Sequence, residues 1–154
     1  MPGIVGIISR AKSPDECQRL VAAMTRSMMS ETFYISGAQA FGDLGIFAGW
    51  VAHDGSFAAD QPFWNERRDI ALLFAGECFP DGTARIASGS ALVQRYEELG
   101  EKFFESLNGL FSGLLVDLRL KRAFLFNDRY GIERLYWHEA KDATYLDRKS
   151  TRLN

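Results

Sequence analysis

The residue with the most distinctive chemistry stands at the start of the chain. The sequence begins Met-Pro-Gly-Ile-Val-Gly-Ile-Ile, so removal of Met1 leaves Pro2 with a free secondary amine. Such an amine can act as a base or form an iminium with a carbonyl substrate. Proline has no side-chain nucleophile, however, and cannot attack a carbonyl carbon as a cysteine thiolate does.

The other potentially reactive side chains are isolated along the sequence. Cys17 falls on the apolar face of an expected helix, and Cys78 follows an expected strand. We interpret both as inert packing groups, with a thiol of Cys78 near a pocket as the alternative. His53 and His138 lie far apart and lack the spacing of metal ligands or of a catalytic triad.

Length and composition predict one globular domain. The chain has 154 residues, of which 47% are hydrophobic and 25% charged. Its two cysteines form no disulfide or metal pattern, which favours a reducing, cytoplasmic location. We expect neither a signal peptide nor a membrane span, because the N-terminus lacks a basic region followed by an apolar one and no apolar run approaches roughly 20 residues. The net charge of −2, without a basic patch, argues against nucleic acid as a partner.

Apolar periodicity and turn residues predict strands and helices in separate groups, which is typical of an α+β fold with two packed sheets flanked by helices. The first helix is the clearest, because Ser13, Pro14 and Glu16 form a capping signal ahead of an apolar stripe. The expected strands are 3–9, 43–52, 69–76, 111–117, 123–127 and one starting at 134–138; the expected helices are 13–30, 91–99 and 101–107; and the expected loops are 54–68 and 79–89.

Four stretches together carry a family resemblance. They are residues 1–8, Gln61-Pro62, Ala75-Gly76-Glu77 and the long stretch 107–136, LNGLFSGLLVDLRLKRAFLFNDRYGIERLY. The chain resembles the class II glutamine amidotransferase domain at the front of asparagine synthetase. The resemblance implies the αββα sandwich of N-terminal-nucleophile hydrolases, incomplete here at its C-terminus. It also implies amide hydrolysis of glutamine by an N-terminal cysteine.

Compared with that family, the chain lacks most of the glutamine site. Pro2 occupies the nucleophile position, so the catalytic residue is unknown. Ala75 replaces the asparagine of the oxyanion hole, and Trp50 aligns with the arginine that binds the substrate carboxylate. Gly76 and Glu77 are kept as relic substrate-binding residues. Glu77 aligns with a residue near the substrate ammonium, but we favour the alternative of an ordinary strand-end residue tied to the neighbouring backbone.

Two further features of the family site have no counterpart. The acid expected near residues 88–91 is missing, and so is the Arg-Gly-Pro-Asp motif expected near residues 30–37. In the well-preserved stretch, Gly109 and Gly131 are expected to form turns, while Asp128 and Arg129 brace a strand junction. The aromatic side chains of Trp50, Phe57, Phe63 and Trp64 either fill space left by the lost pocket or face a missing domain.

The end of the sequence differs in character from the rest. We assign residues 1–146 to a truncated amidotransferase-like domain and residues 147–154 to a non-native tail, with a genuine polar tail as the alternative. The resemblance implies a following synthetase domain that binds ATP and Mg²⁺. No nucleotide-binding Ser-Gly-Gly-x-Asp-Ser loop occurs in this chain, so no cofactor is expected in it.

These observations predict a degenerate, glutaminase-inactive N-terminal domain of an asparagine synthetase-like, ATP-dependent amide ligase. Its expected role is structural, and its expected partner is the C-terminal synthetase domain of a longer chain. The sequence does not decide whether the protein forms an oligomer. Two alternatives remain. One is a working fragment of a glutamine-hydrolysing asparagine synthase, and the other is a stand-alone interaction module.

Overall fold

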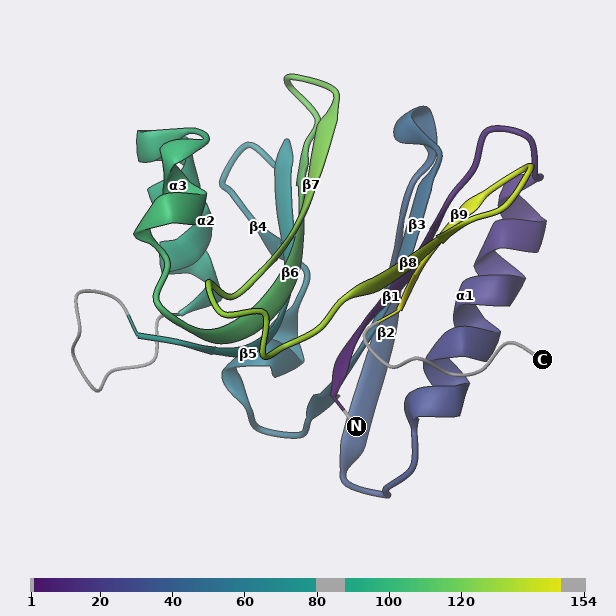
Figure 1. The fold of residues 1–154 in the computed structure, drawn as a ribbon, viewed down its shortest axis with the longest axis horizontal. Helices are drawn as coiled ribbons and strands as arrows, with labels where there is room; N and C mark the ends of the chain where they lie inside the picture. The colour runs from purple at the N-terminus through teal and green to yellow at the C-terminus, as the bar shows by residue number, and fades with distance from the viewer. Residues whose placement is uncertain (1, 80–87, 148–154) are drawn as a thin grey trace. The chain divides into compact units, whose positions relative to one another are not determined.

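The computed structural model describes residues 2–79 and 88–147. Figure 1 shows the chain as a ribbon, with the elements labelled. The chain divides into two compact units. The first unit comprises Met1–Ala59 and Leu135–Asn154, and the second comprises Asp60–Arg134. No helix among the described residues is long and apolar enough to cross a membrane.

The first unit is a five-stranded antiparallel sheet in the order β2-β3-β1-β9-β8, with one long helix packed on it (Figure 1). The central strand β1 pairs with β3 on one side and with β9 on the other. The elements are β1 (Gly3–Ile8), α1 (Pro14–Met28), β2 (Tyr34–Phe41), η1 (Gly42–Leu44), β3 (Ile46–His53), η2 (Phe57–Asp60, which ends in the second unit), β8 (Tyr136–Glu139) and β9 (Thr144–Asp147).

Helix α1 begins and packs as the sequence predicts. The side chain of Ser13 accepts a hydrogen bond from the backbone N–H of Glu16 at 3.2 Å, and Pro14 occupies the first helical position. Burial of its apolar stripe attaches the helix to β1 and β3. The core formed in this way contains Ile7, Cys17, Val21, Phe47 and Ala143.

The second unit is a four-stranded antiparallel sheet in the order β4-β5-β6-β7. Its core is rich in aromatic rings that contact one another at centroid distances of 5.0–6.4 Å. The elements are β4 (Phe63–Trp64), β5 (Ile70–Cys78), α2 (Gly89–Leu99), α3 (Lys102–Ser106), β6 (Gly109–Asp117) and β7 (Arg122–Asn127). The clustered rings are Phe74, Tyr96, Phe103, Phe104, Phe111, Phe124 and Phe126.

The α+β fold class is confirmed, as are most of the predicted elements. Strands β2 and β9 are additions, and the loop expected at 54–68 contains η2 and β4. Of the loop expected at 79–89, residues 80–87 lie outside the described residues. The same holds for residues 148–154 of the expected tail, but Asp147 belongs to β9, where it pairs with Val5 and Tyr136.

Candidate functional site

Pro2 lies at the entry to the central strand of the first unit. The next residue, Gly3, is buried and pairs with Val51 of β3, which places the start of the chain at a fixed point of the sheet. Pro2 itself is half-buried. With Met1 removed, this position offers a ring nitrogen and no thiol or hydroxyl.

Trp50 lies on β3, directly before Val51, the residue that pairs with Gly3. It is the cross-strand neighbour of Ile4 on one side and of Gly37 on the other. The indole covers Gly37 so closely that a Cβ on that glycine would lie 2.6 Å from Trp50 Cζ2. The ring is buried, and its Nε1 has no hydrogen-bond partner among the described residues. A neutral indole therefore fills this part of the sheet, and it offers one donor where an arginine would offer five.

The Ala75-Gly76-Glu77 motif lies in β5 of the second unit. Ala75 is buried opposite Ser112, and its methyl group can donate no hydrogen bond. Gly76 has a φ of +114°, and a Cβ there would collide with the carbonyl oxygen of Leu110. A glycine is therefore required at position 76 because β6 approaches so closely. This requirement does not depend on any role of the Gly76 N–H.

Glu77 is the exposed member of the motif. It pairs with Leu110 near the end of β5. This position suits either interpretation of the residue, a carboxylate near a cationic ligand or an ordinary strand-end side chain. The predicted site residues thus fall into two groups. Pro2 and Trp50 belong to the first unit, and Gly76 and Glu77 belong to the second.

Two more polar side chains near β5 are buried without a full set of partners. Gln61 Oε1 accepts a hydrogen bond from the backbone N–H of Phe74 at 2.8 Å, which extends the β5 ladder beyond the short strand β4. Its Nε2 and the Oγ of Ser112 have no partner among the described residues. The Gln61-Pro62 motif was visible in the sequence. Ser112 was not recognised, because its importance depends on the pairing of β6 with β5.

The two cysteines are packing groups, as the preferred interpretation predicted. Cys17 lies on the buried face of α1, in the core between this helix and its sheet, and burial raises the pKa of its thiol. Burial also raises the pKa of Cys78, against smaller opposing effects of the Asn108 backbone and Arg95. Because the thiolate is the reactive form, neither residue has the character of a nucleophile.

The two histidines serve no common site. His53 stacks on Phe33 with a centroid distance of 5.6 Å and meets the edge of Tyr34, while His138 lies exposed on β8. Among residues 2–79 and 88–147, no group of three or more His, Cys, Asp or Glu side chains could hold a metal ion.

The segment near residues 88–91, where a further acid was expected, has an ordinary structural role. Ser88 is the N-cap of α2, where its hydroxyl accepts a hydrogen bond from the backbone N–H of Ala91 at 3.1 Å. Gly89 packs directly against the ring of Phe63, and this ring is buried in the core. Trp64 is covered by Arg68, whose guanidinium lies 4.8 Å from the ring centroid.

Asp128 organises the segment that follows β7, as the sequence predicted. It is buried, and its carboxylate accepts hydrogen bonds from the backbone N–H groups of Tyr130, Ile132 and Glu133 at 3.1, 3.1 and 2.7 Å. Burial acts to raise the pKa of Asp128, but these three donors outweigh it and hold the pKa below its ordinary value. Gly131 supplies the left-handed turn, with a φ of +64°.

A second buried carboxylate was not predicted. Asp117 at the end of β6 accepts a hydrogen bond from the Tyr96 hydroxyl at 2.9 Å and pairs with Arg119 through Nε and Nη2. Burial acts to raise the pKa of Asp117, but the hydrogen bonds from Arg119 and Tyr96 lower it overall. Burial, together with the hydrogen bond to Asp117, raises the pKa of Tyr96 to about 12. This network joins α2 to the sheet and is structural.

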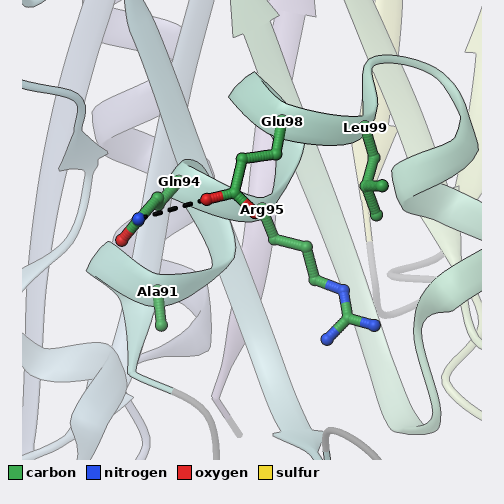
Figure 2. A pocket seen from close by; sticks show the side chains of 5 residues that line it. All are labelled: Ala91, Gln94, Arg95, Glu98 and Leu99. Atoms are coloured by element: carbon green, nitrogen blue, oxygen red, sulfur yellow. Dashed lines mark hydrogen bonds between the residues drawn. The ribbon is translucent and has the colours of Figure 1, made fainter.

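A surface hollow lies along α2 (Figure 2). It has a volume of about 390 Å³. Within it, Gln94 Nε2 donates a hydrogen bond to Glu98 Oε1 at 3.2 Å, so the two polar groups satisfy each other. The hollow has no nucleophile paired with a base and is not a candidate catalytic site. Its lining side chains are Ala91, Gln94, Arg95, Glu98 and Leu99.

Comparison with known proteins gives consistent matches. A family model described as a glutamine amidotransferase domain matches residues 1–149. The chain is 28% identical over 146 residues to the glutamine-hydrolyzing asparagine synthetase of Triphysaria versicolor, covering 88% of this chain and 25% of that protein. It is 26% identical over 146 residues to glutamine-hydrolyzing asparagine synthetase 3 of Arabidopsis thaliana, with the same coverage. The chain thus spans about a quarter of the length of these relatives.

Proposed function

Because this chain belongs to the glutamine amidotransferase domain family, we propose that it is a member that does not hydrolyse glutamine and acts as a structural domain of a longer amide ligase. The observation that carries the proposal is Pro2. In the covalent route that the family resemblance implies, opening a side-chain carboxamide requires a nucleophile that forms and later releases an acyl intermediate. The pyrrolidine nitrogen at this position can accept a proton, but it provides no thiolate for that attack.

Two further positions support the loss of activity. The Ala75 side chain cannot donate a hydrogen bond to a developing oxyanion, and the loss of one such donor typically costs about 10²–10³ in rate. Trp50 covers Gly37 in the first unit and presents no guanidinium for a substrate carboxylate. Each change weakens a different requirement of the reaction, so restoring one alone is not expected to restore activity.

The direct test is release of glutamate from isotope-labelled glutamine by the purified protein. The Triphysaria versicolor relative serves as a positive control. We expect no turnover by this chain or by the full product of its gene. Steady glutamate release that depends on the amidotransferase-like region would refute the proposal and favour a working glutamine-hydrolysing asparagine synthase.

Stepwise variants show which changes matter. Pro2→Cys alone is expected to remain inactive, because the oxyanion donor and the carboxylate anchor are still missing. Pro2→Cys combined with Trp50→Arg and Ala75→Asn is expected to release more glutamate than Pro2→Cys alone, but less than the positive control, because the acid near residues 88–91 and the motif near residues 30–37 are still missing. Full activity of Pro2→Cys alone would mean that Trp50 and Ala75 do not impair the site. A folded triple variant is confirmed by circular dichroism before the assay.

We further propose a cytoplasmic protein in which a synthetase region outside this chain binds ATP and Mg²⁺ and joins a carboxylate to an amine. The support is that the matched relatives are about four times as long as the region they share with this chain. The alternative of a stand-alone interaction module is decided by reading the uninterrupted gene downstream of residue 146. A nucleotide-binding synthetase region there would eliminate the stand-alone module.

A further inference from the structure

The loop after β7 displays two of the three most exposed large apolar side chains among the described residues. Tyr130 is 78% exposed and Ile132 is 59% exposed. We call residues 128–133 the Tyr130 loop. Surface apolar side chains scattered singly need no explanation, but two on one short loop expose apolar area that water disfavours.

The Tyr130 loop is held in place by its own buried carboxylate. Asp128 accepts hydrogen bonds from the backbone N–H groups of both apolar residues and from that of Glu133. The backbone N–H of Asp128 in turn donates to the carbonyl of Phe111 on β6 at 2.8 Å. Because the backbone of the loop is fixed from the sheet outward, binding to its exposed side chains costs less backbone ordering entropy.

The composition of the loop matches that of a protein interface. Arg129 in the loop and Arg134 directly after it are exposed beside the two apolar residues, and Glu133 is half-buried. Tyrosine and arginine are enriched at interfaces and among the residues that contribute most to binding. The chemistry that fits this surface is an apolar depression with carboxylates at its rim, since the arginines would meet opposite charges there.

The length of the relatives indicates which polypeptide provides that surface. The region shared with this chain is only 25% of the Triphysaria and Arabidopsis proteins. A second copy of this chain is the competing occupant, and the measurements below separate the two.

We propose that the Tyr130 loop is the docking surface for the synthetase region of a longer asparagine synthetase-like protein. This inference rests on the proposed function, because it takes its partner from there. In the complete protein, Tyr130 and Ile132 are then covered by an acid-rimmed apolar surface of that region.

Hydroxyl-radical footprinting read by mass spectrometry tests the proposal. The 154-residue chain is compared with the full polypeptide encoded by its gene. We expect modification of Tyr130 to fall roughly eightfold in the longer polypeptide, as its exposure drops from 78% to about a tenth. Leu120, which is 57% exposed on the same unit, is the matched control and should be modified equally in both.

A pair of variants adds a readout of stability. Ile132→Ser is expected to lower the melting temperature of the longer polypeptide and leave that of the 154-residue chain unchanged. Leu120→Ser, at nearly the same exposure, should change neither. Equal modification of Tyr130 in both polypeptides overturns the inference, as does a reading frame without a synthetase region. Protection that rises with the concentration of the 154-residue chain assigns the loop to self-association and also overturns it.

The glutamate-release assay is independent of these measurements. An inactive protein with an uncovered Tyr130 loop refutes the docking surface alone. An active protein with a covered loop refutes the proposed inactivity alone.

Discussion

Replacing Asp117 by asparagine should weaken the second unit more than any exposed acid-to-amide change. The carboxylate is fully buried and accepts hydrogen bonds from the Tyr96 hydroxyl, from the Arg119 side chain, and from the backbone N–H groups of Arg119 and Leu120. Asparagine has a similar shape but carries no charge, and its amide N–H₂ would face donors.

The magnitude follows from the exposure of the partners. Breaking a buried ion pair by removing one member costs about 3–5 kcal/mol. Arg119 is 40% exposed and can regain water, so we expect about 2–3 kcal/mol for Asp117→Asn. Tyr96→Phe removes one hydrogen bond to a charged group and should cost about 1.5 kcal/mol.

Urea unfolding followed by circular dichroism measures these losses of stability, with the exposed Asp43→Asn as a matched control.

The same network predicts how stability depends on pH. The pKa of Asp117 is lowered in the folded state, so the stabilisation by its carboxylate is present above its unfolded-state pKa and is lost as the pH falls through its folded-state pKa. The pKa of Tyr96 is raised to about 12, so its contribution is lost as the pH rises towards that value. Asp117→Asn should therefore show a weaker loss of stability in acid than the wild type. If Asp117→Asn costs no more than Asp43→Asn, the network does not stabilise the fold and the reasoning is wrong.

Two further predictions concern backbone geometry and thiol reactivity. Gly76→Ala should destabilise the protein by well over 1 kcal/mol in the same urea assay, because a Cβ would collide with the Leu110 carbonyl at a φ of +114°. Gly42→Ala, where a Cβ meets nothing within 4 Å, should cost far less, and equal costs would contradict the close approach of β6. Cys17 and Cys78 should react with a thiol reagent at least about tenfold faster in denaturant than in the native protein at pH 8, since burial raises the pKa of both; comparable rates would mean that a thiol is accessible.

Elements with strong local signals could be predicted from the sequence. Helix α1 has its own capping residues and an apolar stripe, and helix α2 ends at Gly100, whose φ is +59°. Strand β5 is a continuous apolar run, and Ile70 to Ala75 are indeed buried.

Other elements depend on neighbours that are distant in the sequence. Strand β2 contains Gly37, Ala38 and Ala40, which have low strand propensity, and it forms because β3 offers a full ladder of partners. The four residues of β9 pair with β1 and β8, and no local pattern of apolar and turn residues predicts this strand.

The candidate site shows the same division. Pro2 and Ala75 were identified from the family resemblance, since what matters is the functional group that each one lacks. The steric requirement at Gly76 and the link from Tyr96 to Asp117, 21 residues away, depend on how strands and helices pack. Such contacts leave no periodic signal in the sequence.

The order of strands in the first unit has a consequence for synthesis on the ribosome. Val5 of β1 pairs with Asp147 of β9, and the whole second unit is encoded between them. During translation, residues Asp60–Arg134 therefore leave the ribosome before β9 is available to pair with β1. The second unit can acquire its native contacts during translation, whereas the sheet of the first unit is completed only after β9 has been translated.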